Sequence, residues 1–535
     1  MTFLTSFIYG VLKNVAVDSY KAGKIEESVT FSDICINLAY HIPFGKYNHN
    51  TIEYMLEKIS QTSLKADKLV NTKMEDVVNK SIIYILPKLT GGGGYQMMNK
   101  KFIDFLDNDV NQIVINTQSS STKIDPDYIA HLRKMGASII NISDHSSPLK
   151  RAQELFDLIR SYNSPIIFNF STKSVVDYLA LIKIKKYMKT PIFWFNIGDY
   201  NPILGLKMSD YWVEYRRIGI TFSKQFRGIN KLYYLPLPIP KRNNVALKKK
   251  YFGIPNNSSV SVTVTPFYKL INDSTPNYFD YLYYLLKKEE NHYHILICPG
   301  LDNRILNKFD KILSKRLILL GYREDLDSIF QICDFGIESF PMFGGIVRKE
   351  MINYSLPFIN IRNHKLDIFS LSDEVDEDYP LFVKNLKEFE YIVSSLIHNT
   401  SIHTSWKEYI DKKRMENEYE LNKLEKENIY NINFMKIHAD DDISTNFEHD
   451  VNKLHNKVIR MRSYLYEFPI KILIRNKVRV SQKTMFNVIC CVLGLFFYRL
   501  IYLRENNDIW SLQKFGEMKR GISNIRYLYR VKKIR

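Results

Sequence analysis

Short apolar segments recur along the first half of the chain at nearly constant spacing, and this regularity constrains the fold most strongly. Each segment has about five residues, is rich in β-branched or aromatic side chains, and begins about 26 to 30 residues after the one before. That spacing leaves room for a helix between successive strands, and a helical crossover joins strands that run parallel. The predicted strands are 82–86, 112–116, 138–142, 165–169 and 191–195.

A second set of strands is predicted after the proline-rich stretch 235–240 (LPLPIP), which we interpret as a linker because proline stops both helices and strands. These strands are 260–264, 293–297, 316–320, 335–337 and 358–361. We therefore predict an α/β protein with two doubly wound, Rossmann-like domains that face each other. The predicted divisions are a helical N-terminal region (1–80), an N-terminal domain (81–240), a C-terminal domain (241–405) and a charged linker with a basic helical extension (406–535).

Positive charge is concentrated at the C-terminus. The chain has a formal net charge of +18, and residues 451–535 contain 19 Lys or Arg against 4 Asp or Glu. The apolar run within 485–503 is flanked by cations and is short for a bilayer span, which needs about 20 residues. Apolar and aromatic residues interleaved with cations favour helices that lie in an anionic membrane interface. A buried core helix with a solvated basic end and a membrane span are the alternatives.

The cysteines and the N-terminus indicate a reducing compartment. The five cysteines are odd in number and form no CxxC pair, so we expect neither a disulfide framework nor a zinc site. The N-terminal segment lacks a basic region and a small-residue cleavage site, so we expect no signal peptide. Together with the basic tail, this favours a cytoplasmic protein bound peripherally at the inner face of the plasma membrane.

The segment 334–357, DFGIESFPMFGGIVRKEMINYSLP, has the pattern of a strand, a glycine turn and a helix. Glycine at 344 and 345 lets a ligand approach the backbone closely. A helix N-terminus offers N–H groups and the positive end of the helix dipole, which suit a diphosphate. Glu350, in the second helical turn, can reach sugar hydroxyls. This is the geometry that a nucleotide-sugar site requires.

Two other predicted strand ends carry candidate ligand contacts. Lys269 follows strand 260–264, where it can neutralise a diphosphate as a point charge or be an ordinary surface lysine. Gly92, Gly93 and Gly94 follow the first strand and either lie against a phosphate or sugar or form a flexible turn. Their run is neither a Walker loop nor a complete GxGxxG motif.

Asp199 is the candidate residue on the acceptor side. It follows strand 191–195 and can orient or deprotonate an acceptor hydroxyl, or cap a turn. His292 and His294 alternate along a strand and share one face, but no further ligand accompanies them, so we predict no metal site. We interpret three Asp-x-Asp pairs as solvated loops: Asp107 and Asp109, Asp125 and Asp127, and Asp440 and Asp442.

These blocks resemble the GT-B glycosyltransferases, particularly the bacterial branch related to the O-GlcNAc transferase and HMW1C-like enzymes. PFYKL around Lys269 looks like the strand-end block of that branch, and 320–357 looks like its donor-binding block. Residues 195–216 are similar to a block in which histidines accompany the aspartate, and Ile197 and Tyr200 take their places here. The resemblance covers about residues 81–400.

The resemblance implies a metal-independent transferase without a cofactor, whose substrate is a nucleoside-diphosphate sugar, with a UDP-sugar as the expected donor. It also implies roles for individual residues. The diphosphate would be held by Lys269, Gly344, Gly345 and Ile346, the ribose by Glu350, and the base would lie near Tyr322 and Arg323.

We therefore expect a bacterial hexosyltransferase that extends a lipid-linked or surface polysaccharide at the cytoplasmic membrane face. The expected partners are the donor, a glycan or lipid-linked acceptor and an anionic membrane surface, and not nucleic acid. Three alternatives stay open: a transferase acting on protein side chains, a non-catalytic GT-B partner subunit, and a nucleic-acid-binding protein that uses the basic tail.

Overall fold

The structure is a computed structural model of the whole chain. It describes residues 2–41, 48–66, 81–87, 89, 99–100, 103, 111–117, 124–145, 147–162, 165–188, 190–196, 202–234, 247–270, 276–299, 301, 309, 315–323, 325–340, 343–362, 375, 378–398 and 401–426. The predicted linker at 235–240 and the basic tail with its apolar run lie outside these residues. The domain divisions expected from the sequence stay predictions, and the two sheets are described as two sheet units.

The first sheet unit has seven parallel strands in the order β3-β2-β1-β4-β5-β6-β7. Their bounds are β1 (Ser81–Leu86), β2 (Asn111–Asn116), β3 (Ser138–Asn141), β4 (Ile166–Asn169), β5 (Ile192–Asn196), β6 (Tyr211–Glu214) and β7 (Leu232–Tyr234). The five strands predicted from the apolar spacing are confirmed. The spacing does not predict β6 and β7, because these strands are close together in the sequence and only the short α8 (Arg217–Phe222) and a π-helix (Ser223–Arg227) separate them.

Both faces of this sheet are buried, as in doubly wound folds. Ile83 and Ile85 of β1 pack with α6 (Pro148–Arg160) and α7 (Val175–Met188), while Tyr84 and Leu86 point to the other face. That second face is aromatic and also packs against α5 (Pro126–Lys134). The rings of Phe170 and Phe195, for example, stack with centroids 4.4 Å apart. The central strands are therefore largely apolar instead of alternating with polar residues, whereas the edge strand β3 is partly exposed.

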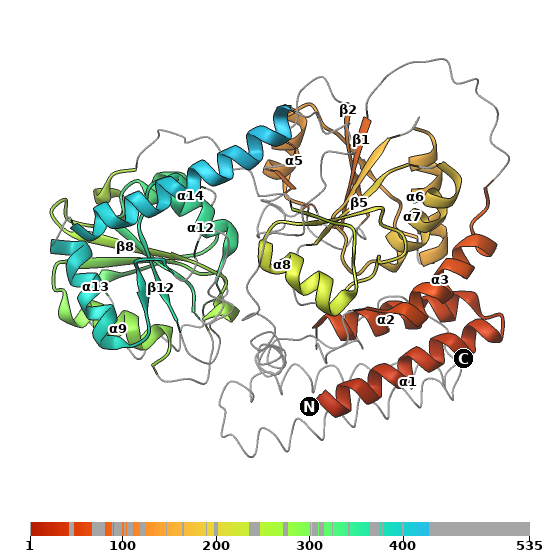
Figure 1. Cartoon of the computed structure of the whole chain (residues 1–535), viewed down its shortest axis with the longest axis horizontal. Coiled ribbons are helices and arrows are strands. Elements are labelled where there is room, and N and C mark those ends of the chain that lie inside the picture. The colour runs from red at the N-terminus through yellow and green to blue at the C-terminus, as the bar shows by residue number, and fades with distance from the viewer. Residues whose placement is uncertain are drawn as a thin grey trace, which may run out of the picture.

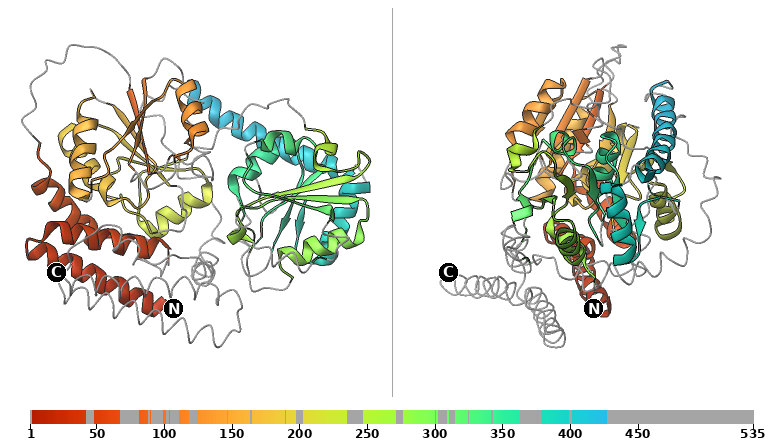
Figure 2. Two further views of the ribbon diagram at one scale, coloured as in Figure 1. Left: turned by 180° about the vertical axis from the view of Figure 1, so that it is seen from behind. Right: turned by 90° about the vertical axis from the view of Figure 1, so that its left-hand side faces the viewer.

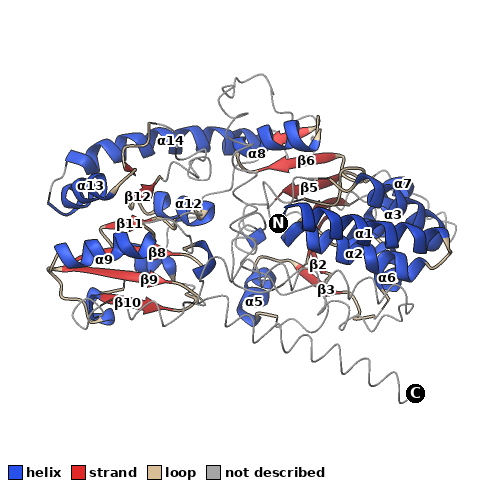
Figure 3. Ribbon diagram, turned by 90° about the horizontal axis from the view of Figure 1, so that it is seen from below, coloured by secondary structure: helices blue, strands red, loops and turns tan. Residues whose placement is uncertain are grey.

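Three helices at the N-terminus form an additional layer: α1 (Thr2–Lys21), α2 (Ile25–His41) and α3 (Asn50–Ser63). Their apolar side chains belong to the same hydrophobic cluster as those of α6 and α7. Figure 3 shows the three helices gathered beside α6 and α7. The helical character expected for this region is thus present, and the helices cover one side of the first sheet unit.

The second sheet unit has six parallel strands in the order β10-β9-β8-β11-β12-β13. The strands are β8 (Ser259–Val264), β9 (His292–Ile297), β10 (Leu317–Leu320), β11 (Phe335–Ile337), β12 (Phe358–Ile361) and β13 (Phe382–Val383). The five predicted strands are again confirmed, and β13 is too short to produce a recognisable apolar run. The helices are α9 (Tyr278–Lys288), α11 (Leu326–Phe330), α12 (Gly345–Asn353), α13 (Leu386–His398) and α14 (Ser401–Lys426), with the short η2 (Lys249–Phe252) and η3 (Phe267–Lys269). The expected α/β class with two parallel sheets is confirmed (Figure 1).

Helix α14 packs against the core of the second sheet unit. Trp406 and Ile410 near its start are buried in the core of the second unit, and the indole N–H of Trp406 donates to the Tyr379 hydroxyl at 3.0 Å. The helix then extends toward the first unit (Figures 1 and 2), and Figure 3 shows it on the opposite side of the molecule from α5. None of the helices in the described part of the chain is long and apolar enough to cross a membrane.

In each sheet the strand order reverses beside its first strand, between β1 and β4 and between β8 and β11. The carboxyl ends of the two strands at such a point diverge into loops on opposite faces, and ligands bind in the crevice between them. The segments after β8 and β11 carry Lys269 and the glycine turn predicted from the sequence. The topology therefore places these two segments side by side.

Helix α3 is docked onto the loop that follows β5 by a buried carboxylate. Glu53 accepts hydrogen bonds from the backbone N–H groups of Gly205 (2.8 Å), Leu206 (3.3 Å) and Lys207 (3.1 Å). Burial raises the pKa of the Glu53 carboxyl, and these three donors oppose the rise. Gly205 has φ +139°, and a Cβ there would lie 2.5 Å from the ring of Trp194, so only glycine fits. The backbone at 205–207 is thus fixed against α3.

We expect Glu53→Ala to destabilise the protein by about 3 kcal/mol, because one buried and two part-buried N–H groups would lose their acceptor. Glu57→Ala is the matched control one turn along α3. Its carboxylate forms a part-exposed ion pair with Lys207 at 3.3 Å, so its loss should change stability by less than about 1 kcal/mol. Denaturant midpoints measured by circular dichroism compare the two, and equal effects would contradict the docking role of Glu53.

Candidate functional site

Lys269 and the start of α12 meet at the point of strand reversal in the second sheet unit. Lys269 ends η3 directly after β8, and α12 begins at Gly345 after β11. The Nζ atom of Lys269 donates a hydrogen bond to the carbonyl oxygen of Phe343 at 3.0 Å. A Cβ on Gly344 would lie 3.9 Å from the same Nζ atom. The fold thus brings the predicted cation and the predicted glycine turn into contact.

The N-cap residue of helix α12 is a glycine, so no N-cap side chain caps the helix. Gly344 is the N-cap residue, and its carbonyl accepts the hydrogen bond from Arg348 N at 3.0 Å that closes the first turn. The N–H groups of Gly345, Ile346 and Val347 therefore precede the first intrahelical hydrogen bond. These N–H groups and the positive end of the helix dipole suit a phosphate group.

A close contact with β11 fixes the position of α12. A Cβ on Gly336 would lie 2.4 Å from the Sδ atom of Met351 in α12 and 3.1 Å from Phe358 Cβ, so a side chain there would push the helix away. All residues of α12 from Arg348 to Asn353 are buried. Glu350, the predicted ribose ligand, is one of them, and this role stays a prediction.

A buried ion pair lies under the start of α12. Glu338, directly after β11, accepts two hydrogen bonds from the guanidinium of Arg348, one of them 2.7 Å long, and another from the Asn360 side chain. Burial raises the pKa of the Glu338 carboxyl, while Arg348, Asn360 and Lys269 oppose the rise. This pair is not among the site residues predicted from the sequence. The sequence pattern that could have predicted it is an acid directly after a buried strand and an arginine in the next helix.

Tyr322 and Arg323, expected near the base, follow the edge strand β10. Two strands separate them from the point of reversal, and the Tyr322 side chain is 48% exposed. Arg323 forms two hydrogen bonds with Asp325, which lowers the pKa of the Asp325 carboxyl. Their proximity to a base stays a prediction.

Asp199, the acceptor-side candidate, and the glycine run Gly92, Gly93 and Gly94 lie outside the described residues. The described residue closest to Asp199 on its N-terminal side is Asn196, which ends β5. Its amide donates to both carboxylate oxygens of Glu214 (2.8 and 2.9 Å), and the Trp212 indole donates to the same group at 2.8 Å. Burial raises the pKa of Glu214. The segment that carries Asp199 therefore leaves the sheet from a fixed strand end.

The two sheet units touch at the start of α12. The guanidinium carbon of Arg216, from the first unit, lies 5.1 Å from the ring centroid of Phe343, and that of Arg348 lies 4.1 Å from the same centroid. Ile346 of α12 packs against the aromatic cluster of the first unit. The predicted diphosphate site is thus next to residues of both units.

The predicted solvated acidic pairs include one helix cap. Asp125 accepts hydrogen bonds from the backbone N–H groups of Asp127 and Tyr128 and caps α5. The pairs at 107/109 and 440/442 lie outside the described residues. Within the residues that the structure describes, no group of three or more His, Cys, Asp and Glu side chains is arranged to hold a metal ion.

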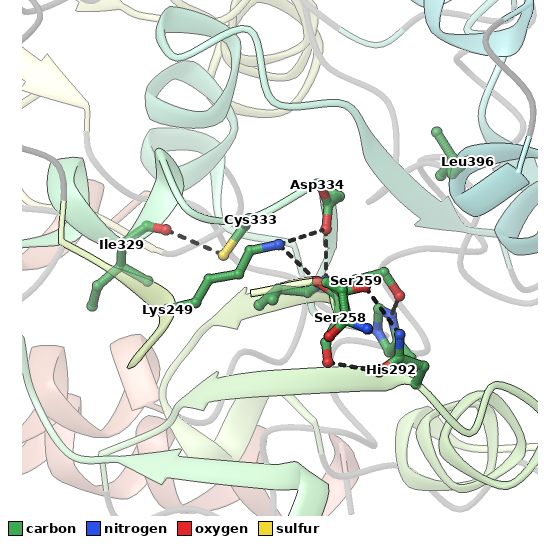
Figure 4. Close-up of polar contacts among 12 residues, drawn as sticks. Lys249, Ser258, Ser259, His292, Ile329, Cys333, Asp334 and Leu396 are labelled. Atoms are coloured by element: carbon green, nitrogen blue, oxygen red, sulfur yellow. Dashed lines mark hydrogen bonds and ion pairs between the residues drawn. The ribbon is translucent and has the colours of Figure 1, made fainter. Parts of the chain in front are cut away.

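A second polar network lies at the opposite edge of the second sheet unit, where β8, β9 and β11 begin (Figure 4). Lys249 Nζ donates to the carbonyl oxygen of Ser258 at 2.7 Å and lies 3.9 Å from Asp334, which accepts a hydrogen bond from Val260 N at 2.7 Å. These contacts join η2 and the start of β11 to β8. We interpret the network as structural, because ligands of parallel sheets bind at the carboxyl ends of the strands.

The two predicted same-face histidines belong to a buried hydrogen-bond chain. Ser261 Oγ lies 2.7 Å from His292 Nε2 and 2.7 Å from His294 Nδ1, and His294 Nε2 lies 3.1 Å from the Tyr278 hydroxyl. The shared Ser261 confirms that both rings lie on one face. Burial lowers the pKa of both histidines, that of His294 to about 3. Each neutral ring thus forms hydrogen bonds within the core.

No family model matches the chain, and no curated protein matches it. Several solved structures match part or most of it. HepE of Anabaena, in complex with UDP and glucose, is 13% identical, with 65% of this chain and 100% of that chain covered and a TM-score of 0.48. A glycosyltransferase of Rickettsia africae is 15% identical over 64% and 98%, with a TM-score of 0.47. The O-GlcNAc transferase of Thermobaculum terrenum is 12% identical over 86% and 84%, with a TM-score of 0.44. The case for a function rests on the side chains described above.

Removing Arg348 alone should destabilise the protein more than removing the whole pair. Arg348→Met leaves the Glu338 carboxylate buried without its guanidinium, and we expect a loss of about 3 to 5 kcal/mol. The double variant Glu338→Gln, Arg348→Met should be more stable than Arg348→Met itself. Denaturant midpoints of the wild type, both single variants and the double variant give the coupling energy, and simple additivity would argue against a buried, coupled pair.

The histidine chain predicts a specific acid sensitivity. The unfolded chain binds a proton at His294 below about pH 6.5, whereas the folded state keeps this ring neutral down to about pH 3. Stability from this residue is therefore present above pH 6.5 and falls as the pH is lowered, by about 2 kcal/mol at pH 5. His294→Asn should be less stable than wild type at pH 7.5 but lose less stability on going to pH 5. His398→Asn, at an exposed position, is the control, and a wild-type pH slope in His294→Asn would refute the prediction.

Proposed function

We propose that this chain is a glycosyltransferase of the GT-B type that transfers a sugar from a nucleoside-diphosphate sugar to a hydroxyl group. The observation that carries the proposal is the meeting of Lys269 with the start of α12 at the point of strand reversal. A diphosphate placed there would meet an ammonium group, the first N–H groups of a helix and its positive dipole end. A UDP-sugar is the expected donor.

In the transfer, the bond between the anomeric carbon and the diphosphate oxygen breaks, and its electron pair stays on that oxygen. The acceptor oxygen forms the new bond to the anomeric carbon, and the hydroxyl proton passes to a base, for which we propose Asp199. Lys269 and the start of α12 stabilise the charge that develops on the leaving diphosphate. Glu350 would hold the ribose, and Tyr322 and Arg323 would lie near the base. Because Lys269 and the helix start stabilise the charge on the leaving diphosphate, we expect activity to persist when EDTA removes metal ions.

For the acceptor we propose a hydroxyl of a growing lipid-linked or surface polysaccharide at the cytoplasmic face of a bacterial membrane. The support is chemical: residues 451–535 combine an excess of cations with apolar and aromatic side chains, which suits an anionic lipid surface. A protein acceptor and a role as a non-catalytic partner subunit are the competing outcomes.

The donor site is tested by thermal-shift and titration measurements with UDP, GDP, CMP and dTDP. We expect one nucleoside diphosphate to stabilise the protein. Lys269→Met should weaken its binding about 10- to 100-fold, the amount expected for one hydrogen bond between charged groups. Lys287→Met, an exposed lysine near the end of α9, is the matched control and should bind as the wild type does.

Enzymatic activity is then measured as release of the nucleoside diphosphate from the donor, with and without a glycan acceptor. Lys269→Met should lower kcat by about 100-fold or more. Binding without turnover on any glycan or peptide acceptor would favour the non-catalytic partner. No stabilisation of the wild type by any of the four nucleotides would refute the transferase proposal.

A further inference from the structure

Helix α2 meets the first sheet unit near the carboxyl edge of its strands. It packs against α6 and α7, and its Glu26 accepts a hydrogen bond from Ser147, the N-cap residue of α6. Helix α7 follows β4, which lies next to β1 at the point of strand reversal. The junction of α2 with α6 and α7 thus borders the edge at which ligands of doubly wound sheets bind.

A buried carboxylate lies at this junction, in the first turn of α7. The side chain of Asp177 is 0% exposed. Its Oδ2 atom accepts a hydrogen bond from the hydroxyl of Thr117, directly after β2, at 3.1 Å. Within the described residues, its Oδ1 atom has no hydrogen-bond partner. Since a buried carboxylate needs donors to replace its lost hydration, this environment disfavours the charged form.

Three further charged side chains from separate segments meet near this carboxylate. Asp33 comes from α2, Arg151 from α6 and Lys173 from the segment before α7, and all three are half-buried. Arg151 donates a hydrogen bond to the carbonyl oxygen of Thr117, and its Nε atom is buried with no hydrogen-bond partner among the described residues. Lys173 lies over the ring of Tyr40 of α2, 4.6 Å from the centroid. The charge of Arg151 acts on both carboxyls.

The two carboxyls bind protons more strongly in the folded chain than in the unfolded one. Burial raises the pKa of Asp177 from 3.8 to about 6, while neighbouring hydroxyls and Arg151 oppose the rise. Burial also raises the pKa of Asp33 to about 6, with Lys173 and Arg151 opposing the rise and Asp177 adding to it. The resulting stabilisation is fully present below about pH 3.8 and is lost as the pH rises through about 6.

We propose that the junction of α2 with α6 and α7 is a proton-dependent contact, in which proton uptake by Asp33 and Asp177 strengthens the packing of α2 on the first sheet unit. Uptake removes two buried charges and their mutual repulsion. Opening of α2 would return both carboxyls to water, where they release their protons again. The inference goes beyond the proposed function and does not depend on it.

Cys35 of α2 provides a local probe of this contact. Its thiol is fully buried two residues from Asp33, so a reagent reaches it only when α2 opens. The rate of its reaction with dithiodipyridine is followed by mass spectrometry of the peptide that contains Cys35, in the native protein and in urea at the same pH. The ratio of the two rates measures opening and cancels the pH dependence of the thiol itself. In the wild type this ratio should fall about 10- to 100-fold from pH 7.5 to pH 5, about tenfold for each carboxyl.

Replacing both carboxyls by amides tests the mechanism. An amide has the shape of a protonated carboxyl and carries no charge. The double variant Asp33→Asn, Asp177→Asn should therefore label more slowly than the wild type at pH 7.5 and change little between pH 7.5 and pH 5. Asp157→Asn is the matched control on α6. Its part-exposed carboxylate pairs with Arg160 at 3.1 Å, and this variant should keep the wild-type pH dependence.

Two results would overturn the inference: a labelling ratio in the wild type that does not fall on acidification, and a wild-type pH dependence in the double variant. Should the double variant fold poorly by circular dichroism, Asp33→Asn alone changes a half-buried position. That variant should lose part of the pH dependence, and full retention would contradict the proposal. Either failure leaves the proposed donor site standing, because nucleotide binding is measured separately.

Discussion

A carboxylate buried at the end of a parallel strand has to be neutralised, and both sheets of this protein do so with the same set of side chains. In each case the glutamate accepts a hydrogen bond from an asparagine of the neighbouring strand and lies beside a buried arginine from the segment that follows. The sets are Glu214 with Asn196 and Arg227, and Glu338 with Asn360 and Arg348. Buried pairs of this kind add little net stability, because desolvation offsets their attraction. Their effect is to fix where the strands end.

The candidate site depends on these fixed strand ends. Beyond Glu214 the chain continues to Arg216, and beyond Glu338 it continues to Phe343 and the start of α12. The pairing of Glu338 with Arg348 keeps that arginine inside the second sheet unit, below the helix start. The positive charge next to the N-terminus of α12 then comes from Lys269, from Arg216 and from the helix dipole, and these three come from separate segments of the fold. Charge from separate segments can converge on one anion only if every strand end is held in place.

Most strands could be predicted from the sequence, because the spacing and length of apolar runs are local properties. Ten strands follow from apolar runs, whereas β6 and β7 begin closer to the preceding strand than the predicted runs of the first sheet do, and β13 has only two residues. The contact between Lys269 and the turn at Gly344 could also be predicted, since strand order and known motifs bring them together. The partners of Arg216 and Arg348 could not be predicted, because the sequence around an arginine does not indicate which ring or carboxylate its guanidinium contacts. The contact of Arg216 with Phe343 depends on how the two sheet units meet, and the pair of Arg348 with Glu338 depends on how α12 packs on its own sheet. No local pattern encodes either arrangement.

The two sides of the candidate site also differ in the segments that hold them in place. The side proposed to bind the donor consists of a strand, a glycine turn and a helix start, an arrangement that requires little beyond backbone geometry and one lysine. The loop after β5 on the other side is held by Glu53, which belongs to α3 and thus to the N-terminal helices, a region outside the resemblance to GT-B enzymes. A change in these helices would move that loop while leaving the donor side intact. The backbone at 205–207 therefore depends on α3, whereas the turn at Gly344 is positioned by β11 and Lys269 of the second sheet unit.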